Sequence, residues 1–339
     1  MRRPRERRGF GPNALYAFGL RAAWVCSLGV SGLGIGGCRS GSLAPQPSPP
    51  SGEAEAKALV ARARVEVEQA SRTVPASVAG DGSSLYVPEG GPDGQRPLLV
   101  FLHGLGGTGA RLVSGIGLEA FAEAQRFAFM APDGAEDYSG RRFWNASPSC
   151  CNFDQLSVDH VAMLRGWITD ALKHPRVDPK RVYLVGYSNG GFMAYRAACE
   201  LGGLLRGIVS IAGAGPSDPR ACNAAHPLSV VEIHGDADPI VSFDGGYLFA
   251  DRRRPRHPSA ADSLGAWADV NGCGKTAVPG RTLDLDPRLA GAETQVLRYP
   301  GCSDNPVELW RIRGGDHASG LSRYSLQAIW DFIQADAAR

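Results

Sequence analysis

The sequence predicts an α/β fold, in which helices cover both faces of a mainly parallel sheet. From about residue 83, short apolar runs alternate with longer segments whose apolar residues recur every three or four positions. Glycine and polar residues follow the ends of the apolar runs. Since parallel strands are joined by helical crossovers, this alternation favours a parallel sheet. Its regular spacing predicts one domain over residues 75–339.

The apolar runs are predicted as strands and the periodic segments as helices. Strands are expected at residues 84–88, 97–104, 127–134, 181–187, 207–214, 229–236 and 307–314, and helices at residues 111–125, 156–174, 189–201, 259–270 and 319–335. In the helix over 156–174, Val161, Leu164 and Ile168 fall on one face. Asp159, near its start, suits the positive end of the helix dipole.

Residues 1–38 have the pattern of an export signal. Six arginines and one glutamate occupy residues 1–37, and a modest apolar stretch runs from Ala22 to Cys38. That stretch is about as long as the apolar region of a signal peptide and too short and glycine-rich for a membrane span. Ile35-Gly36-Gly37-Cys38 resembles a bacterial lipobox, so we predict a lipoprotein anchored through Cys38. The alternative is a tail with a chance cysteine.

Residues 39–74 are predicted to be a tether and a stalk. The stretch "SGSLAPQPSPPSG" (40–52) is rich in proline and serine, which favour an extended chain. The helix-like "EAEAKALVARARVEVEQASR" follows it. The domain over residues 75–339 is therefore expected outside the cell, in the periplasm, or anchored to a membrane as a lipoprotein.

Charge and cysteine content narrow the functional classes. The net charge of the chain is +2, and residues 1–37 alone carry +5. The rest of the chain therefore carries −3, which does not suggest a nucleic-acid partner. The basic run at 252–257 is expected to be a solvated loop. An even number of cysteines in an oxidising compartment predicts disulfides, and those after the leader are Cys150, Cys151, Cys199, Cys222, Cys273 and Cys302.

The stretch "RVYLVGYSNGGFMAYRAACE" has the pattern of a nucleophile elbow. An apolar run leads into Ser188, and a helix-like pattern begins directly after it. The turn of such an elbow is too tight for flanking side chains, and Gly186 and Gly190 stand at both flanks. A serine hydroxyl is a weak nucleophile without a base, an orienting carboxylate and oxyanion donors. Ser188 is therefore predicted as a nucleophile that needs these companions.

The acid and the base are expected after the serine, where later strands end. Asp238 stands in the turn before Pro239 and can point back across the sheet edge, so it is predicted as the acid. Asp236, closer to the strand, is expected to brace the loop. His317 follows the last strand and is predicted as the base. His103 and His234, which precede glycines at strand ends, are expected to bond to loop backbone.

The oxyanion hole requires backbone N–H groups. We assign them to Asn189, directly after the nucleophile, and to Leu105 in the glycine-rich loop His103–Gly107. The histidines form no recognisable metal-ligand cluster, and no cysteine pair has zinc-site spacing. The sequence therefore predicts neither a metal nor a cofactor.

Together the motifs resemble a family of secreted α/β-hydrolases, the polyhydroxybutyrate depolymerase-like esterases, which are related to feruloyl and acetylxylan esterases. The resemblance covers roughly residues 80–335 and rests on "PLLVFLHGLGGTG", "APDG", "CC" before a helix carrying "VD", "RVYLVGYSNGGFMAYRAACE", "IHGDADPIV", "NGC" and "GGDHASG", in that order. It implies an α/β-hydrolase fold, Ser188 as nucleophile, Asp238 as acid, His317 as base, and no cofactor.

The chain departs from the family's pattern after the base. The family often has a tryptophan and a proline there, where this chain has Ala318-Ser319-Gly320. We expect Trp144 and Tyr187 to supply a substrate-binding wall instead, with packing inside its loop as the alternative role of Trp144. His160 replaces a second acidic residue after "VD", which is expected to affect packing only.

Positions in the predicted fold also suggest how cysteines pair. Cys199 ends the helix after Ser188 and Cys222 precedes the next strand, so both belong at the amino edge of the sheet and are expected to pair. Cys273 and Cys302 flank the excursion before the last strand and are expected to close it. Cys150 and Cys151 are left without an assigned partner, in a structural role.

The sequence thus predicts an exported serine carboxylic-ester hydrolase that works through an acyl-enzyme. Its expected partner is an ester substrate, either short acyl esters such as hydroxyalkanoate oligomers or feruloyl and acetyl esters of polysaccharides. A peptidase or thioesterase is an alternative, because the acyl mechanism does not choose its leaving group. A non-catalytic surface binding module is a second alternative.

Overall fold

A computed structural model describes residues 84–89, 94–218, 222, 226–302 and 304–337. All of them belong to one compact unit, Pro50–Arg339. The export signal, tether and stalk predicted over residues 1–74 lie outside the described residues, as does the predicted start of the domain at residue 75.

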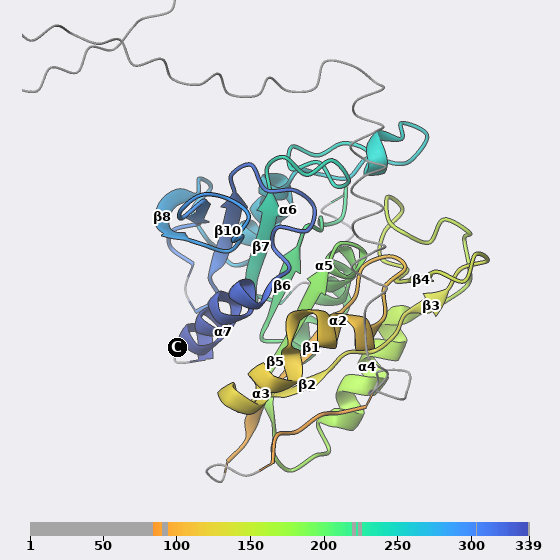
Figure 1. Cartoon of the computed structure of the whole chain (residues 1–339), viewed down its shortest axis with the longest axis vertical. Helices are drawn as coiled ribbons and strands as arrows, with labels where there is room; N and C mark the ends of the chain where they lie inside the picture. The colour runs from red at the N-terminus through yellow and green to blue at the C-terminus, as the bar shows by residue number, and fades with distance from the viewer. Residues whose placement is uncertain (1–83, 90–93, 219–221, 223–225, 303, 338–339) are drawn as a thin grey trace, which may run out of the picture. The chain divides into compact units, whose positions relative to one another are not determined.

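The described domain is built on a sheet whose strands lie in the order β2-β1-β5-β6-β7-β10-β9-β8 (Figure 1). The pairings from β2 to β10 are all parallel, and those of β9 and β8 are antiparallel. The mainly parallel sheet predicted from the sequence is confirmed. In chain order the strands are β1 (Arg96–Leu102), β2 (Ala128–Met130), β5 (Val177–Tyr187), β6 (Gly207–Ile211), β7 (Ser229–Gly235), β8 (Val278–Leu283), β9 (Thr294–Arg298) and β10 (Val307–Ile312).

Helices pack on both faces of the sheet and create two cores. Alternate residues of β1 point to opposite faces, so Leu98 and Val100 join one core while Leu99 and Phe101 join the other. The first core includes α4 (His160–Ala171), α5 (Asn189–Leu201) and α6 (Ala260–Val270). The second includes α2 (Gly109–Ile116), α3 (Leu118–Gln125) and α7 (Arg323–Ala337). Both faces of the parallel strands are therefore buried.

Shorter elements connect these layers. A two-stranded hairpin of β3 (Ala135–Glu136) and β4 (Arg142–Phe143) projects from the loop after β2. The short 3₁₀ helices η1 (Gly202–Leu204) and η3 (Leu248–Ala250) follow α5 and β7. Asp159 caps α4, since its side chain accepts the N–H of Ala162 at 3.0 Å, as its position near the helix start had indicated.

Some element boundaries differ from the sequence expectations. The helix predicted over 111–125 is two helices, because Gly117 between them has a φ of 69°. The run at 84–88 forms only a single antiparallel bridge, between Tyr86 and Phe129. β8 and β9 were not predicted, because β8 contains Pro279 and Gly280 and is mostly exposed, so it has no apolar run to mark it.

Three disulfides link the described residues. Cys199–Cys222 and Cys273–Cys302 form as predicted, the second closing the excursion that carries β8 and β9. The neighbours Cys150 and Cys151, which the sequence left without assigned partners, are bonded to each other. This last disulfide lies in the loop between β4 and α4, close to Asn189.

Candidate active site

Ser188 stands on a sharp turn between β5 and α5. Its φ of 53° and ψ of −118° lie outside the regions that most side chains adopt, and its N–H donates to Ile211 O at 2.7 Å. A Cβ at Gly186 would collide with Gly190 O, and one at Gly190 would collide with Leu102 O. The turn therefore has the tight geometry of a nucleophile elbow, and its two glycines stand where side chains do not fit.

Ser188, His317 and Asp238 form one hydrogen-bonded line across the ends of β5, β10 and β7. His317 Nε2 lies 2.9 Å from Ser188 Oγ, and His317 Nδ1 lies 2.7 Å from Asp238 Oδ2. Asp238 is 7% exposed and His317 is 4% exposed, so water barely competes for these contacts. The structure thus brings together all three side chains that the sequence predicted as a triad.

Asp238 is held as a carboxylate by its surroundings. Its Oδ1 accepts the N–H groups of Ile240 at 2.7 Å and Val241 at 3.0 Å. Burial alone would raise the pKa of Asp238, but the adjacent His317 and the hydrogen bonds from His234 and His317 lower it below its ordinary range. An ionised Asp238 can orient His317 and stabilise it when it is protonated.

Asp236 has the bracing role expected of it. Its Oδ1 accepts the N–H of Gly314 at 2.6 Å, and its Oδ2 lies 2.9 Å from Arg311. These contacts tie the loop after β7 to the end of β10 and to the loop after it, which carries His317. Asp236 therefore supports the site without facing His317.

The loop after β1 runs directly beside Ser188. A Cβ at Gly104 would lie 3.4 Å from Ser188 Cβ and 3.1 Å from the Tyr187 ring, so only glycine fits easily. The N–H groups of Gly106 and Gly107 are already donated, to Arg142 O at 2.7 Å and Gly104 O at 3.0 Å.

The N–H groups of Leu105 and Asn189, by contrast, make no hydrogen bond to another group of the described residues. They therefore stay available to an incoming oxygen, as the assignment of the oxyanion hole requires.

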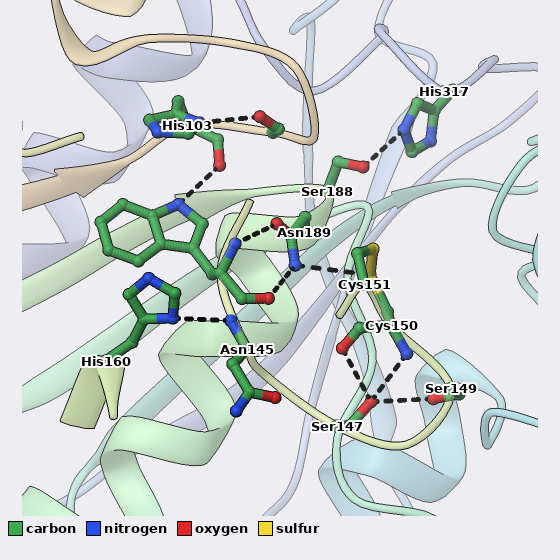
Figure 2. The surroundings of a disulfide bond; sticks show 12 residues. His103, Asn145, Ser147, Ser149, Cys150, Cys151, His160, Ser188, Asn189 and His317 are labelled. Atoms are coloured by element: carbon green, nitrogen blue, oxygen red, sulfur yellow. Dashed lines mark hydrogen bonds between the residues drawn. A yellow bond between two sulfur atoms is a disulfide. The ribbon is translucent and has the colours of Figure 1, made fainter. Parts of the chain in front are cut away.

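The side chain of Asn189 ties the elbow to this loop. Its Oδ1 accepts the N–H of Trp144 at 2.7 Å, and its Nδ2 donates to Trp144 O at 2.9 Å and to Cys150 Sγ at 3.5 Å (Figure 2). The indole N–H of Trp144 in turn donates to His103 O at 3.0 Å. One buried network therefore joins the elbow, the loop after β1 and the Cys150–Cys151 disulfide.

Trp144 does not form the open substrate wall that was expected. Its side chain is fully buried between the glycine-rich loop and α4, and its ring packs against His103 and His160. The alternative role, packing within its loop, is the one that the structure has. Tyr187 is 9% exposed and its ring centroid lies 5.3 Å from that of His317, so it borders the triad. Burial raises the pKa of Tyr187 and keeps it neutral.

The buried histidines His103 and His160 hold loops by hydrogen bonds. His103 Nε2 accepts the N–H of Gly134 at 3.0 Å and its Nδ1 donates to Gly104 O at 2.7 Å, a neutral ring bonded to loop backbone as predicted. His160 was expected to affect packing only, which is wrong. Its ring nitrogens face the N–H groups of Ala135 and Asn145 at 3.1 and 2.8 Å. Burial lowers the pKa of His160 to about 4, which keeps it neutral and able to accept at one of its two nitrogens.

Two features near the triad were missed from the sequence. Arg288, between β8 and β9, binds Asp316 at 2.8 and 3.1 Å and Ser319 at 3.1 Å. It therefore braces the loop after His317, where the family that the sequence resembles often has a tryptophan. Glu232 and His234 lie fully buried behind Asp238. A glutamate inside an apolar run of a central strand was the signal that could have revealed the second feature, because a buried charge needs a partner.

Metal sites and membrane-spanning helices are both absent from the described part of the chain. No group of three or more histidine, cysteine or acidic residues is arranged to hold a metal ion among the described residues. Within the same residues, no helix is both long and apolar enough to cross a membrane.

Comparisons with known proteins show what this chain is similar to. The phospholipase/carboxylesterase family model matches residues 89–254. The chain is 34% identical to NocK of Nocardia uniformis subsp. tsuyamanensis over 180 residues, which cover 53% of this chain and 49% of NocK. It is 29% identical to feruloyl esterase B of Piromyces equi over 258 residues, which cover 71% of this chain and 42% of that protein. The chain thus spans half or less of the length of these two relatives.

A further relative and a solved structure match over most of their own length. Feruloyl esterase C of Emericella nidulans is 27% identical over 263 residues, which cover 74% of this chain and 83% of that protein. The acetyl xylan esterase from Aspergillus awamori superposes with a TM-score of 0.53 at 16% identity, covering 75% of this chain and 96% of that one. This likeness shows the fold.

The fold is that of the α/β-hydrolases, and part of the chain matches the phospholipase/carboxylesterase family model. The chain is similar to proteins named feruloyl esterase, as its sequence motifs had indicated.

Proposed function

We propose that this protein is an exported serine esterase that cleaves carboxylic esters through an acyl-enzyme on Ser188. The observation that carries the proposal is the line from Asp238 through His317 to Ser188, with contacts of 2.7 and 2.9 Å. A serine on a tight elbow with a base and an oriented carboxylate in this order is the arrangement that activates a hydroxyl for acyl transfer.

The proposed reaction has two halves. Ser188 Oγ attacks the ester carbonyl while His317 Nε2 takes its proton, and ionised Asp238 stabilises the imidazolium. The N–H groups of Leu105 and Asn189 receive the oxyanion. His317 then gives its proton to the departing alcohol, which leaves an acyl group on Ser188. In the second half, His317 activates a water that attacks the acyl carbonyl, and the acid is released as Ser188 regains its proton.

The proposed substrates are short acyl esters, with feruloyl or acetyl esters of polysaccharides favoured. The similarity to proteins named feruloyl esterase, and to one named bifunctional acetylxylan esterase/xylanase from Neocallimastix patriciarum, supports this choice. Hydroxyalkanoate oligomers stay in the proposal because the sequence motifs resemble the polyhydroxybutyrate depolymerase-like group. All of these substrates present the same reacting atoms to Ser188.

Export is supported by the three disulfides, which persist in oxidising compartments. The anchoring of the mature chain through a lipid on Cys38 is part of the proposal. Mass spectrometry of the mature N-terminus tests it, with a lipidated Cys38 as the first residue expected. An unmodified peptide that begins upstream of Cys38 would exclude the anchor.

A panel of substrates tests the function. Wild type is assayed on p-nitrophenyl acyl esters, methyl ferulate, acetylated xylan and 3-hydroxybutyrate oligomers, beside Ser188→Ala and a matched control, Ser229→Ala. Ser229 is a buried serine whose hydroxyl bonds Asp336 at 2.5 Å, away from the triad. We expect Ser188→Ala to abolish hydrolysis and Ser229→Ala to retain it.

Labelling with a fluorophosphonate separates the alternatives. An adduct on Ser188 in wild type is expected, because the probe needs an activated serine. Turnover retained by Ser188→Ala, or no adduct on Ser188, contradicts the proposal and favours a binding module. Faster turnover of peptides or thioesters than of every ester in the panel would instead favour a peptidase or a thioesterase.

A further inference from the structure

A second pair of ionisable side chains lies behind the acid of the proposed triad. Glu232 and His234 are two residues apart on β7 and point to the same face of the sheet, where they are 0% and 1% exposed. His234 Nδ1 lies 2.9 Å from Glu232 Oε1. His234 Nε2 lies 2.8 Å from Val241 O and 3.4 Å from Asp238 Oδ2. The ring therefore bridges Glu232 to the loop that carries Asp238.

The neighbours of His234 suit a ring that carries a proton on both nitrogens. Val241 O cannot donate a hydrogen bond, so Nε2 carries a proton. Glu232 Oε1 accepts the N–H of Gly213 at 3.2 Å, and a carboxylate there accepts from Nδ1 as well. Burial raises the pKa of Glu232, but the hydrogen bond and the charge of His234 act in the opposite direction. Because a neutral imidazole has one N–H only, a carboxylate at Glu232 pairs with an imidazolium. Although burial opposes the charge, the bonds to Asp238 and Glu232 outweigh it and raise the pKa of His234 to about 10.

The other groups around Glu232 and His234 are either neutral or paired with a separate charge. Tyr195 of α5 and Ser210 of β6 lie beside Glu232 and are buried. The Phe243 ring packs edge-on to His234 at 5.7 Å. Arg311, the register partner of His234 on β10, lies 5.3 Å from the Phe243 centroid and forms an ion pair with Asp236 at 2.9 Å.

The remaining titratable neighbours are two further histidines. His257 is buried nearby, and burial lowers its pKa, so it is neutral. His317 shares Asp238 Oδ2 with His234 from the opposite side. The titratable groups nearest to Asp238 are therefore the two imidazoles that it contacts.

We propose that His234 is a positioning residue that stays an imidazolium through neutral pH and, held by Glu232, fixes the orientation and charge of Asp238. This inference rests on the proposed function, in which Asp238 orients the base His317. A cation 3.4 Å from the shared oxygen draws part of the carboxylate charge away from His317. It thereby weakens the electrostatic attraction between Asp238 and a protonated His317.

The protonation state of His234 is tested without any assay of activity. The full chain is labelled with ¹⁵N-histidine, and the ring nitrogen signals are followed by NMR from pH 6 to 9. The signal of His234 is assigned by its loss in His234→Gln. We expect both nitrogens of His234 to remain protonated throughout. A non-protonated nitrogen of His234 at pH 7 would overturn the proposal.

The effect on the base is tested by the pH profile of kcat/KM. His234→Gln keeps a donor toward Val241 O but removes the positive charge of the ring. The acid limb of the kcat/KM profile is therefore expected to shift to higher pH by roughly one unit. Phe243→Leu is the matched control, because it loosens the packing on His234 and keeps the charge. Its acid limb is expected at the wild-type pH.

The outcomes separate this inference from the proposed function. An unchanged acid limb in His234→Gln, or an equal shift in Phe243→Leu, would overturn the positioning role while leaving the esterase in place. A wild type that hydrolyses no ester contradicts the proposed function instead. In that case the nitrogen signals still decide whether His234 is the imidazolium that the structure requires.

Discussion

Trp144 links two parts of the proposed oxyanion hole, one through its indole N–H and the other through its backbone. Its N–H donates to His103 O at 3.0 Å, while its backbone is held on both sides by the side chain of Asn189. Preorganised donors contribute to catalysis because they need no rearrangement when charge develops. The position of the loop that carries Leu105 thus depends on a residue that is itself fully buried.

We predict that Trp144→Phe lowers kcat by about tenfold and leaves KM nearly unchanged. The loss is smaller than the roughly hundredfold or more expected when a donor itself is removed, because the loop is only released. Steady-state kinetics on a p-nitrophenyl ester, normalised to fluorophosphonate-titrated sites, measures it. Trp267→Phe removes an equally buried indole from α6 and is the control. Equal losses of kcat in both variants would show that packing, not the bond to His103, is responsible.

At the scale of elements, the connection between β8 and β9 supports the loop that carries His317. Arg288 of this connection binds Asp286 at 2.7 Å and Asp316 at 2.8 Å, and Asp316 directly precedes His317. Hydrogen bonds to both carboxylates raise the pKa of Arg288, so it stays charged. An edge hairpin thereby constrains the base from the side opposite to Asp238.

We predict that Arg288→Ala lowers kcat several-fold and changes stability by only about 1 kcal/mol. The side chain is half exposed, and exposed ion pairs contribute little to folding, whereas the freed loop lets His317 move away from Ser188. Kinetics and urea unfolding of the same preparation separate the two effects. Arg281→Ala, on β8 and 3.7 Å from Glu308, serves as the matched variant and is expected to keep the wild-type kcat. If both variants lose activity equally, Arg288 has no special role.

The sequence locates the parallel strands, and with them the three side chains of the proposed triad, because one pattern controls both. Buried parallel strands are mainly apolar, and their ends lie at one sheet edge, so Ser188, Asp238 and His317 are expected close together. β8 and β9 lack this pattern, because β8 is an exposed edge strand and β9 alternates buried with half-buried residues.

Contacts between distant segments are not visible in the sequence either. The burial of Trp144 and the bridge of Arg288 to Asp316 each depend on tertiary geometry that spacing does not encode. Glu232 alone left a trace, since a charged residue inside a central strand has to be compensated.

At the scale of the whole domain, the same buried charges couple the site to stability. Asp238 has a lowered pKa, so its contribution to stability is present above its ordinary value of about 3.9 and is lost as the pH falls through the folded value. His234 has a raised pKa and acts in the opposite direction. Its contribution is complete below its ordinary value of about 6.5 and is lost as the pH rises through the folded value of about 10.

We therefore predict that the free energy of unfolding of the wild type falls between pH 7 and 9.5, and falls less in His234→Gln. One proton held by the folded state and released on unfolding gives a slope of at most about 1.4 kcal/mol per pH unit, which sets the largest possible difference between the two proteins. Tyr183, Tyr187 and Tyr195 have raised pKa values, so they also release protons on unfolding near the upper end of this range, but they do so equally in both proteins and cancel from the difference between the slopes. Urea unfolding of the oxidised proteins at several pH values measures both slopes, with Phe243→Leu as a destabilised variant that keeps the imidazolium and hence the wild-type slope. Parallel slopes in wild type and His234→Gln would mean that His234 is neutral in the folded protein.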